Sequence, residues 1–403
     1  MSLDEVEGRL VAEVEGRAAQ MVRDLTELVS IPTGHGSHAG LERTRTWMRV
    51  RLGALGASIT RHEGMPRPAW LREPSVAGAD GGDLICARRL DGATGTRILL
   101  SGHLDTVHDP VGTFQTLSEE VDGIRQGPGC ADMKGGLVVG LTALEALHAC
   151  GVSVRWSFVL NADEESGSFA SADHLTALAR EHDIALVLEP AAPGGKFVTE
   201  RAGSAQFRID AFGRAAHAGR DAAQGISAVG ALCAAISRVL AHSDPAAGRT
   251  INIGPLQGGE ATNIVPDHAI AWGNARYTSD EQRRDIDALF ASVATGGDCL
   301  PRIEIRTSHN RPRKPQTSEV AALAGVALGV AAERGVAAGT ASTGGVSDAN
   351  ILQAAGIPVL DGLGVRGGNL HRADEYIVTA SLVERATMLA LLIYRLARGR
   401  SVP

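Results

Sequence analysis

Residues 96–107 read TRILLSGHLDTV, an apolar run that ends in glycine, histidine and aspartate. A segment rich in Gly, Ala and Leu, GGLVVGLTALEALHACG (135–151), has helical character, and VRWSFVLNADEE (154–165) is a second apolar run with a polar end. DLICARRL (83–90) and IALVLEP (184–190) repeat the β-prone pattern. This alternation predicts an α/β sheet with helices on both faces. In such sheets the functional groups collect where the strands end.

The alternation of apolar β-prone runs with helical segments changes after Pro193 and resumes from about Pro312. Between these points we expect two strands in 196–213, a helix over 226–240, strands near 250–259 and 268–277, and a helix over 280–293. This β-α-β-β-α-β order predicts a small α+β domain, ferredoxin-like, inserted into the larger one. At the N-terminus, apolar positions at helical spacing run through Leu25, Val29 and Ile31 and stop at Pro32.

Composition excludes several classes of protein. The chain has 403 residues and a net charge of −7, which argues against general nucleic-acid binding because that needs a basic face. No apolar run approaches the roughly 20 residues of a membrane span. The N-terminus is acidic and amphipathic, unlike a signal or transit peptide, so we expect a cytoplasmic protein, although a leader trimmed from the chain would leave no trace. Five scattered cysteines indicate reduced thiols: Cys86, Cys130, Cys150, Cys233 and Cys299.

The first candidate site residues are His103 and Asp105, directly after the apolar run 97–100. Alternate residues of a strand point the same way, so the two side chains can share a face. A metal-bound histidine usually needs a carboxylate or carbonyl on its other ring nitrogen. A buried histidine paired with a carboxylate for stability alone is the alternative interpretation.

Asp132 stands among glycines in GPGCADMKGG (127–136), just before the expected helix. Its commonest use at such a place is to cap the helix N-terminus. A phosphate-binding loop is disfavoured, because the spacing matches neither the Walker nor the dinucleotide pattern. By itself this motif is ambiguous.

Carboxylates also end the next two apolar runs. Asp163, Glu164 and Glu165 follow WSFVL, and Glu189 closes VLEP. Crowded like charges cost energy unless a cation or a shared proton relieves them. Adjacent residues diverge in direction, so Glu164 and Glu165 can take different roles, one binding a metal and one relaying protons. A solvated acidic turn is the alternative, and His371 in NLHRADEY would be an unremarkable loop histidine on its own.

Together these residues form a mixed nitrogen and oxygen donor set at strand ends of one domain. Such a set suits Zn²⁺ or, less selectively, Mn²⁺ and Co²⁺. Two ions about 3.5–4 Å apart need a bridging carboxylate and can activate one shared water. The residues alone leave a metallohydrolase and a purely structural cluster both open.

Six motifs in a fixed order resemble those of the M20 metallopeptidases, the aminoacylase/carboxypeptidase family. The resemblance covers nearly the whole chain, and the motifs are SGHLDTV, GPGCADMKGG, DEESGS, LEP, GRAAHAG and NIVPD. The first three motifs are most similar to the glutamate carboxypeptidase branch. The resemblance implies a catalytic domain of residues 1–192 and 305–403 and an inserted lid and dimerisation domain of residues 193–304. It also implies two Zn²⁺ ions, one held by His103 and Glu189 and one by Glu165 and His371, with Asp132 bridging both. Asp105 would orient His103, and Glu164 would be the general base and then the general acid.

In the inserted domain the resemblance implies further roles. His217 of GRAAHAG would reach the active site of the partner subunit in a homodimer and stabilise the tetrahedral oxyanion. Asn263 and Arg276 match family positions near the substrate carboxylate, for which arginine offers a bidentate fork. The loop STGGVSDAN would place backbone groups near the substrate, with Gly345 as the candidate. A turn histidine and a surface arginine are the alternatives for His217 and Arg276.

Three departures from the family pattern concern specificity. Asn274 stands where the family often has Asp, Arg372 follows His371 where a small or hydroxyl residue is common, and HNRPRKP (309–315) is unusually basic. Arg311, Arg313 and Arg372 could favour an acidic substrate side chain or could be solvated surface.

The predicted function is therefore a dizinc carboxypeptidase that hydrolyses an amide bond and releases a C-terminal amino acid, with glutamate as the candidate, from a small N-acyl or peptide substrate. A deacylase acting on N-acetyl or N-succinyl amino acids is the nearest alternative. A non-catalytic scaffold that keeps the fold is the alternative of another class, and it predicts losses among the site residues that this sequence does not have.

Overall fold

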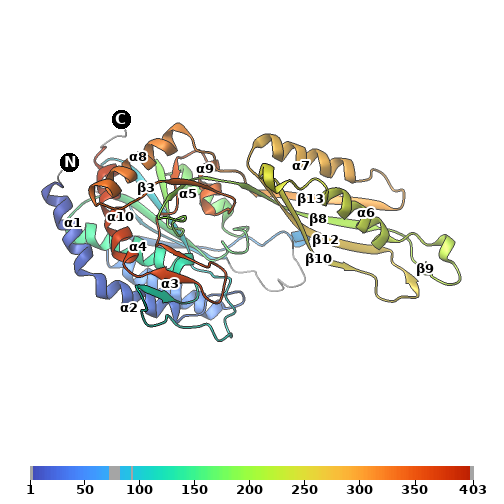
Figure 1. Ribbon diagram of the computed structural model, residues 1–403, viewed down its shortest axis with the longest axis horizontal. Helices are drawn as coiled ribbons and strands as arrows, with labels where there is room; N and C mark the ends of the chain where they lie inside the picture. Colours follow the sequence, from blue (N-terminus) through green and yellow to red (C-terminus); the bar gives the residue numbers. More distant parts are fainter. Residues whose placement is uncertain (1–2, 72–81, 92–93, 400–403) are drawn as a thin grey trace.

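A computed structural model describes residues 3–71, 82–91 and 94–399 of the chain. Its larger domain contains both ends of the described chain, and the smaller domain extends from one side of it (Figure 1). No helix in these described ranges combines the length and apolar character needed to cross a membrane.

The larger domain is built on a six-stranded mixed sheet of order β1-β2-β5-β3-β6-β15. The central strand β3 pairs in parallel with β5 on one side and β6 on the other, while β1 and β2 run antiparallel at one edge. The strands span Ser58–His62 (β1), Leu84–Arg89 (β2), Arg97–His103 (β3), Arg155–Asn161 (β5), Ile184–Val187 (β6) and Val359–Leu360 (β15).

Helices cover both faces of this sheet, as the sequence predicted. Ile98 and Leu100 of β3 pack into a core cluster with α4 (Gly135–Ala149) and α10 (Ser381–Ala397). Leu99, between them, belongs to a separate cluster on the opposite face with α5 (Ala172–Arg180) and α9 (Asp348–Ala354). Successive side chains of a strand alternate between faces, so a continuous apolar run is what a strand buried on both sides requires.

The N-terminal region contains two helices where the sequence suggested one continuous pattern. Asp4 and Glu7 form a capping box at the start of α1 (Glu5–Gly16). Arg17 then takes a non-helical conformation with φ −93° and ψ 1°, which separates α1 from α2 (Ala18–Val29). Gly16 weakens the helix at this junction, because glycine has low helix propensity. α3 (His38–Gly53) follows, and α8 (Ser318–Glu333) packs near α10.

The smaller domain has a β-α-β-β-α-β order, as predicted, but its first and last strands differ from the expected ones. Of the two strands expected in 196–213 only the second, Gly203–Phe212, belongs to it, because Phe197–Arg201 pairs with a strand of the larger domain. Its last strand, Arg302–Arg311, was not expected. Its four strands form an antiparallel sheet of order β10-β12-β8-β13. Alternate residues of β8 pack against the two helices on one face of the sheet, and they are Ala205, Phe207, Ile209 and Ala211. The elements are β8 (Gly203–Phe212), α6 (Ala228–Leu240), β10 (Thr250–Gly258), β12 (His268–Tyr277), α7 (Asp280–Val293) and β13 (Arg302–Arg311).

The ends of this sheet lie close to the predicted domain boundaries. β8 begins at Gly203, ten residues after the first boundary, and the second boundary, between 304 and 305, falls inside β13. A two-stranded ribbon of β9 (Ala216–His217) and β11 (Ile264–Val265) lies at the end of the inserted domain farthest from the larger domain (Figure 1).

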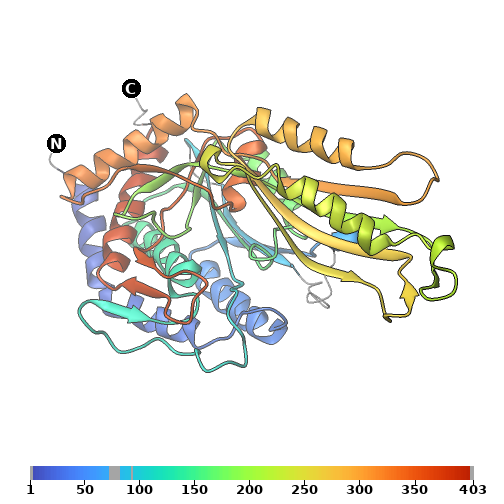
Figure 2. The ribbon, with the colours of Figure 1, turned by 45° about the vertical axis from the view of Figure 1, so that its right-hand side comes forward.

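Short strands complete the larger domain and shape the surroundings of the main sheet. β7 (Phe197–Arg201) pairs in parallel with β14 (Thr340–Thr343). β16 (Gly367–Gly368), β17 (Tyr376–Val378) and β4 (Ile124–Gln126) form a small antiparallel sheet. The loop between β16 and β17 carries His371. Figure 2 shows the two domains from a second direction.

Candidate metal centre and active site

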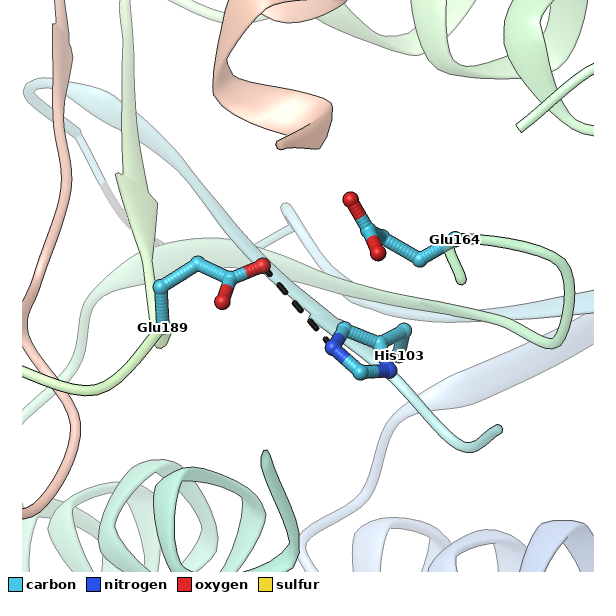
Figure 3. Close-up of side chains that lie close together, drawn as sticks. All are labelled: His103, Glu164 and Glu189. Atoms are coloured by element: carbon cyan, nitrogen blue, oxygen red, sulfur yellow. Dashed lines mark ion pairs between the residues drawn. The ribbon is translucent and has the colours of Figure 1, made fainter. Parts of the chain in front are cut away.

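The candidate site lies at the carboxyl ends of the three adjacent parallel strands β5, β3 and β6. His103 is the last residue of β3, Glu164 follows β5 by three residues, and Glu189 follows β6 by two. Parallel neighbours end at the same edge of a sheet, so the residues that follow β5, β3 and β6 come together there. Figure 3 shows these three side chains converging, and the Nε2 atom of His103 lies 3.8 Å from Oε1 of Glu189.

Two groups of ligand atoms share His103. In one, His103, Glu164 and Glu189 have ligand atoms within 4.8 Å of one another, and in the other His103, Asp132 and Glu165 do. Asp132 does not cap α4, because no side-chain cap bond forms there and its carboxylate lies 3.2 Å from Nε2 of His103. Its turn, Cys130–Lys134, leads into α4 and gives Asp132 a non-helical backbone.

His371 approaches the same carboxylates from the loop between β16 and β17. Its Nε2 atom lies 3.4 Å from Oδ2 of Asp132 and 3.4 Å from Oε2 of Glu165. Its backbone is left-handed, with φ +65°, a conformation that is uncommon for a residue other than glycine and is often found at functional sites. Asp132 therefore lies between the two histidines, since its other oxygen faces His103.

Asp105 contacts both His103 and the loop that carries the glutamates. The Nδ1 atom of His103 lies 2.9 Å from the Asp105 carbonyl oxygen and 3.5 Å from its Oδ1 atom. The Asp105 carboxylate also accepts hydrogen bonds from the backbone N–H groups of Glu164 and Glu165, at 3.3 and 2.9 Å. The two ring nitrogens of His103 therefore face different residues: Nδ1 faces Asp105, and Nε2 faces Asp132.

The electrostatics of this cluster suit a bound cation. Burial, together with the nearby charge of Asp132, raises the pKa of Glu165 and of Glu189 well above the ordinary range. Burial likewise raises the pKa of Glu164 to about 7. The Oε1 atom of Glu165 is buried and has no hydrogen-bond partner among the described residues. Crowded buried carboxylates with a spare oxygen, beside two imidazoles, are a donor set that fits a divalent metal.

Glu375 holds the turn that carries Asp132. This fully buried carboxylate accepts hydrogen bonds from the backbone N–H groups of Gly129, Ala131 and Asp132, at 3.2, 2.8 and 3.0 Å. It also lies 2.6 Å from Nε2 of His108. Sequence reasoning missed Glu375, and its place in NLHRADEY, four residues after His371, was the available signal.

A cavity of about 490 Å³ opens beside the cluster and lies between the two domains. Asp105 and Glu165 line it from the larger domain and Arg276 from β12. Arg276 donates from Nε to Oδ1 of Asn274 at 3.0 Å and from Nη1 to the carbonyl of Gly344 at 3.3 Å. No carboxylate among the described residues forms an ion pair with it, and burial and the charge of Arg311 lower its pKa.

Residues 99–395 match the sequence profile of Peptidase family M20/M25/M40. The chain belongs to this family. Carboxypeptidase G2 of Pseudomonas sp. (strain RS-16) is 29% identical over 399 residues, which cover 94% of this chain and 90% of that protein. A succinyl-diaminopimelate desuccinylase of Methylorubrum extorquens is 29% identical over 325 residues, 72% of this chain and 80% of that one. A solved tripeptidase structure from Staphylococcus aureus has the same fold, with a TM-score of 0.73 at 24% identity, covering 94% of this chain and 99% of that one.

Not all residues predicted for the M20 site lie together in one chain. Those brought together are His103, Asp105, Asp132, Glu164, Glu165, Glu189 and His371, with Arg276 on the adjoining cavity. His217 belongs to the distant ribbon, and neither it nor Asn263 lines the cavity among the described residues. The carbonyl of Asn263 accepts a hydrogen bond from the N–H of Ala218, beside His217. Gly345 lies near the cavity without lining it, and its carbonyl accepts from Nη1 of Arg201 at 3.1 Å.

The three arginines of the specificity hypothesis have different environments in this M20 chain. Arg311 is buried and its Nη2 atom lies 2.8 Å from Oε1 of Glu164, so it is not solvated surface. Arg313 forms an ion pair with Asp280 at 3.0 Å on the surface of the inserted domain. Arg372 is 68% exposed and pairs with Asp374, and neither Arg313 nor Arg372 lines the cavity among the described residues.

Other polar residues of the M20 cavity were not anticipated. Arg67 donates to Oε1 of Gln206 at 3.1 Å, across the two domains, and its guanidinium lies 5.2 Å from the ring centre of Phe169. Asn252 lines the same cavity from β10. These side chains come from segments without any motif, so only the folded arrangement brings them together. Asn274, which the sequence singled out as a departure from the family pattern, lines the cavity from β12.

Proposed function

We propose that this chain is a dinuclear zinc amidohydrolase that releases a C-terminal amino acid from a small N-acyl or peptide substrate. The observation that carries the proposal is the pair of ligand groups sharing His103, with Asp132 between His103 and His371, at the edge of a cavity that also contains Arg276. This arrangement supports a metal-binding role for the cluster and a carboxylate-binding role for Arg276 on the same cavity.

In this proposal His103 and Glu189 would hold one zinc and Glu165 and His371 the other, with Asp132 as the ligand they would share. The mixed nitrogen and oxygen donors also admit Co²⁺ or Mn²⁺. When bound, such ions lower the pKa of a water molecule and polarise the scissile carbonyl. Glu164 is close enough to join the first group, but its ion pair with Arg311 favours a role other than that of a ligand.

The residues around the ligands have distinct tasks. Asp105 accepts from Nδ1 of His103 and thereby directs the other ring nitrogen, Nε2, toward the metal side of the cluster. Glu164 accepts a proton from the attacking water and returns it to the departing amine. The reaction therefore needs no covalent intermediate between substrate and protein.

The substrate class follows from the cavity. Arg276 has no carboxylate partner among the described residues and can form charge-assisted hydrogen bonds to the free carboxylate of the amino acid that is released. A volume of about 490 Å³ falls within the range of small-molecule sites and accommodates an acyl group larger than acetyl. The similarity to carboxypeptidase G2 makes glutamate the first candidate for the released residue. The similarity to a desuccinylase keeps N-succinyl amino acids as the second candidate substrate.

A homodimer completes the proposed site. His217 is exposed at the far end of the inserted domain, and its Nδ1 atom accepts hydrogen bonds from the N–H groups of Gly219 and Arg220, both at 3.1 Å. A neutral histidine with Nδ1 as acceptor carries its proton on Nε2 and presents a donor there. We propose that this donor serves the oxyanion in the partner subunit, with Asn263 beside it.

We also propose a cytoplasmic location. All five cysteines are free in the structure, and Cys233 and Cys299 are exposed. Exposed unpaired thiols persist in reducing compartments.

Metal analysis paired with amine release tests the proposed function. The panel is benzoyl-glutamate, N-acetylornithine, N-succinyl-diaminopimelate and simple dipeptides. About two equivalents of zinc with glutamate release supports the carboxypeptidase, whereas two equivalents with deacylation of the acetyl or succinyl substrate replaces the substrate and keeps the mechanism. Absence of metal uptake after zinc addition would overturn the site and leave a non-catalytic scaffold.

A further inference from the structure

The side chain of Arg311 contacts both the backbone carbonyl and the side-chain carboxylate of Glu164. Its Nη2 group lies 2.7 Å from the Glu164 carbonyl oxygen and 2.8 Å from the Glu164 carboxylate oxygen Oε1. The same nitrogen lies 2.6 Å from Oγ of Ser168, at the other end of the loop that carries the glutamates. A guanidinium that contacts the backbone and the carboxylate of one residue restricts both the loop and the side-chain rotamer.

Arg311 belongs to the inserted domain's last strand, not to the domain that contains Glu164. It ends β13, where it pairs with Ser204 at the start of β8. The preceding residue, Asn310, donates from its side-chain amide to the carbonyl of Gly167. The joint between the two domains therefore holds the loop 163–168 through two consecutive side chains.

A buried polar network fixes the position of this guanidinium in turn. Asp348 lies 3.8 Å from Nη2 of Arg311, and it accepts hydrogen bonds from Ser168 and from the side-chain amide of Asn161, the last residue of β5. Asp348 and Asn161 are both buried. Groups that orient a catalytic side chain are effective when their own rotamers are locked in this way.

We propose that Arg311 is a positioning residue for hydrolysis, which holds the Glu164 carboxylate and its loop in the working orientation from the joint of the inserted domain. The proposal rests on the proposed function, in which Glu164 transfers the proton. A small misplacement of a catalytic group is costly in rate, so this role predicts a loss in kcat. A residue that bound substrate would instead change KM, and a purely structural residue would change only stability.

The test compares R311M and R311K with R313M, using kcat, KM, bound zinc and melting temperature of the full chain. Arg313 is the matched control, because it lies two residues away and pairs with exposed Asp280. We expect R311M to lower kcat about 100-fold with KM within about threefold of wild type and zinc retained. R311K restores part of kcat, since a lysine ammonium supplies one charged donor in place of Nη2 but on a more flexible chain. R313M matches wild type.

A double variant shows whether Arg311 acts through Glu164. Glu164→Asp keeps the carboxylate but withdraws it by one methylene, so adding R311M to E164D should cost less than about threefold if the two residues act as a unit. The full R311M loss in the E164D background would overturn the proposal. So would a rise in KM with kcat retained, or a lower melting temperature with unchanged kcat.

Failure of the two proposals is distinguishable. A wild-type protein that binds zinc but hydrolyses none of the amides overturns the proposed function, and the Arg311 role with it. A wild-type protein that hydrolyses them while R311M matches its kcat overturns the Arg311 role alone.

Discussion

Two regions of this chain carry predicted catalytic groups, and they differ in how completely a single chain builds them. The cluster around His103 draws its candidate metal ligands from the ends of β3, β5 and β6 and from neighbouring loops of one domain. The β9–β11 ribbon holds His217 exposed, away from the cavity of its own chain. The cluster thus depends on the strand order of one domain, whereas the catalytic role proposed for the ribbon requires a second copy of the chain.

Glu164→Ala tests the cluster and should have the largest effect. Removing the proton-transfer group should lower kcat by about 100- to 10,000-fold, because general acid–base catalysis contributes that much. Bound zinc should stay near the wild-type amount, measured by elemental analysis of the purified variant. Glu119→Gln, a change at a carboxylate whose side chain is 98% exposed, is the control and should leave both quantities unchanged. Loss of zinc in Glu164→Ala would mean that Glu164 is a ligand and that the base is another residue.

His217→Ala tests the ribbon in the same assay. Loss of one oxyanion donor should lower kcat by about 100- to 1,000-fold. Wild-type turnover by this variant would remove His217 from the reaction.

Mixing the two inactive variants then tests where His217 acts. In a mixed dimer of Glu164→Ala and His217→Ala, one of the two sites has both an intact Glu164 and an intact partner histidine. Random pairing in a symmetric dimer makes half of the dimers mixed, so activity should recover to about a quarter of wild type. Co-expression of the two variants followed by a turnover assay measures this recovery. Activity that stays at the level of the single variants would place both residues in sites of one chain and erase the contrast between the two regions.

Arg276→Met tests whether the inserted domain also contributes a substrate-binding group to the cavity of its own chain. Charge-assisted hydrogen bonds contribute about 1.5–3 kcal/mol, so KM should rise about 10- to 100-fold with a smaller change in kcat. Initial rates over a range of substrate concentrations give both constants. Arg372→Met is the matched control, because Arg372 is exposed and paired with Asp374. An equal KM increase in the control would restore the specificity role that the sequence suggested for Arg372.

The sequence alone predicted the parts of this molecule that repeat a local pattern. The helix expected over 280–293 is α7, Asp280–Val293, and the central helix-strand-strand-helix succession of the inserted domain is also as predicted. The cluster could be anticipated because each of its groups directly follows an apolar run or stands in a recognisable motif. In parallel neighbouring strands this position in sequence translates into proximity in space.

The residues that orient the cluster could not be predicted in the same way. Arg311 and Arg313 stand two positions apart in one basic run, yet one is buried against Glu164 and the other faces solvent. Strand alternation does not separate them, since β13 ends at Arg311 and Pro312 follows. Glu375 is similar, because its partners are backbone N–H groups more than 240 residues away in sequence, and backbone groups leave no residue-specific signal. Contacts of this kind follow from the assembled fold.

Alkylation of the cysteines should have the smallest effect on activity and completes the comparison between the regions. Cys233 on α6 and Cys299 in the inserted domain are exposed, whereas Cys130 lies buried beside Asp132 and Cys86 lies in the buried strand β2. Burial raises the pKa of Cys86 to about 12 and that of Cys130 still further, which keeps both thiols protonated and unreactive at neutral pH.

Iodoacetamide should therefore label Cys299 and Cys233 in the native protein with little change in turnover, and Cys86 and Cys130 only after unfolding in urea. Mass spectrometry of the labelled peptides reads out each site. Rapid labelling of Cys130 in the native protein would show that the turn carrying Asp132 opens, which would contradict a rigid cluster. Slow labelling of Cys233 together with fast labelling of Cys299 would identify α6 as a surface covered by the partner subunit.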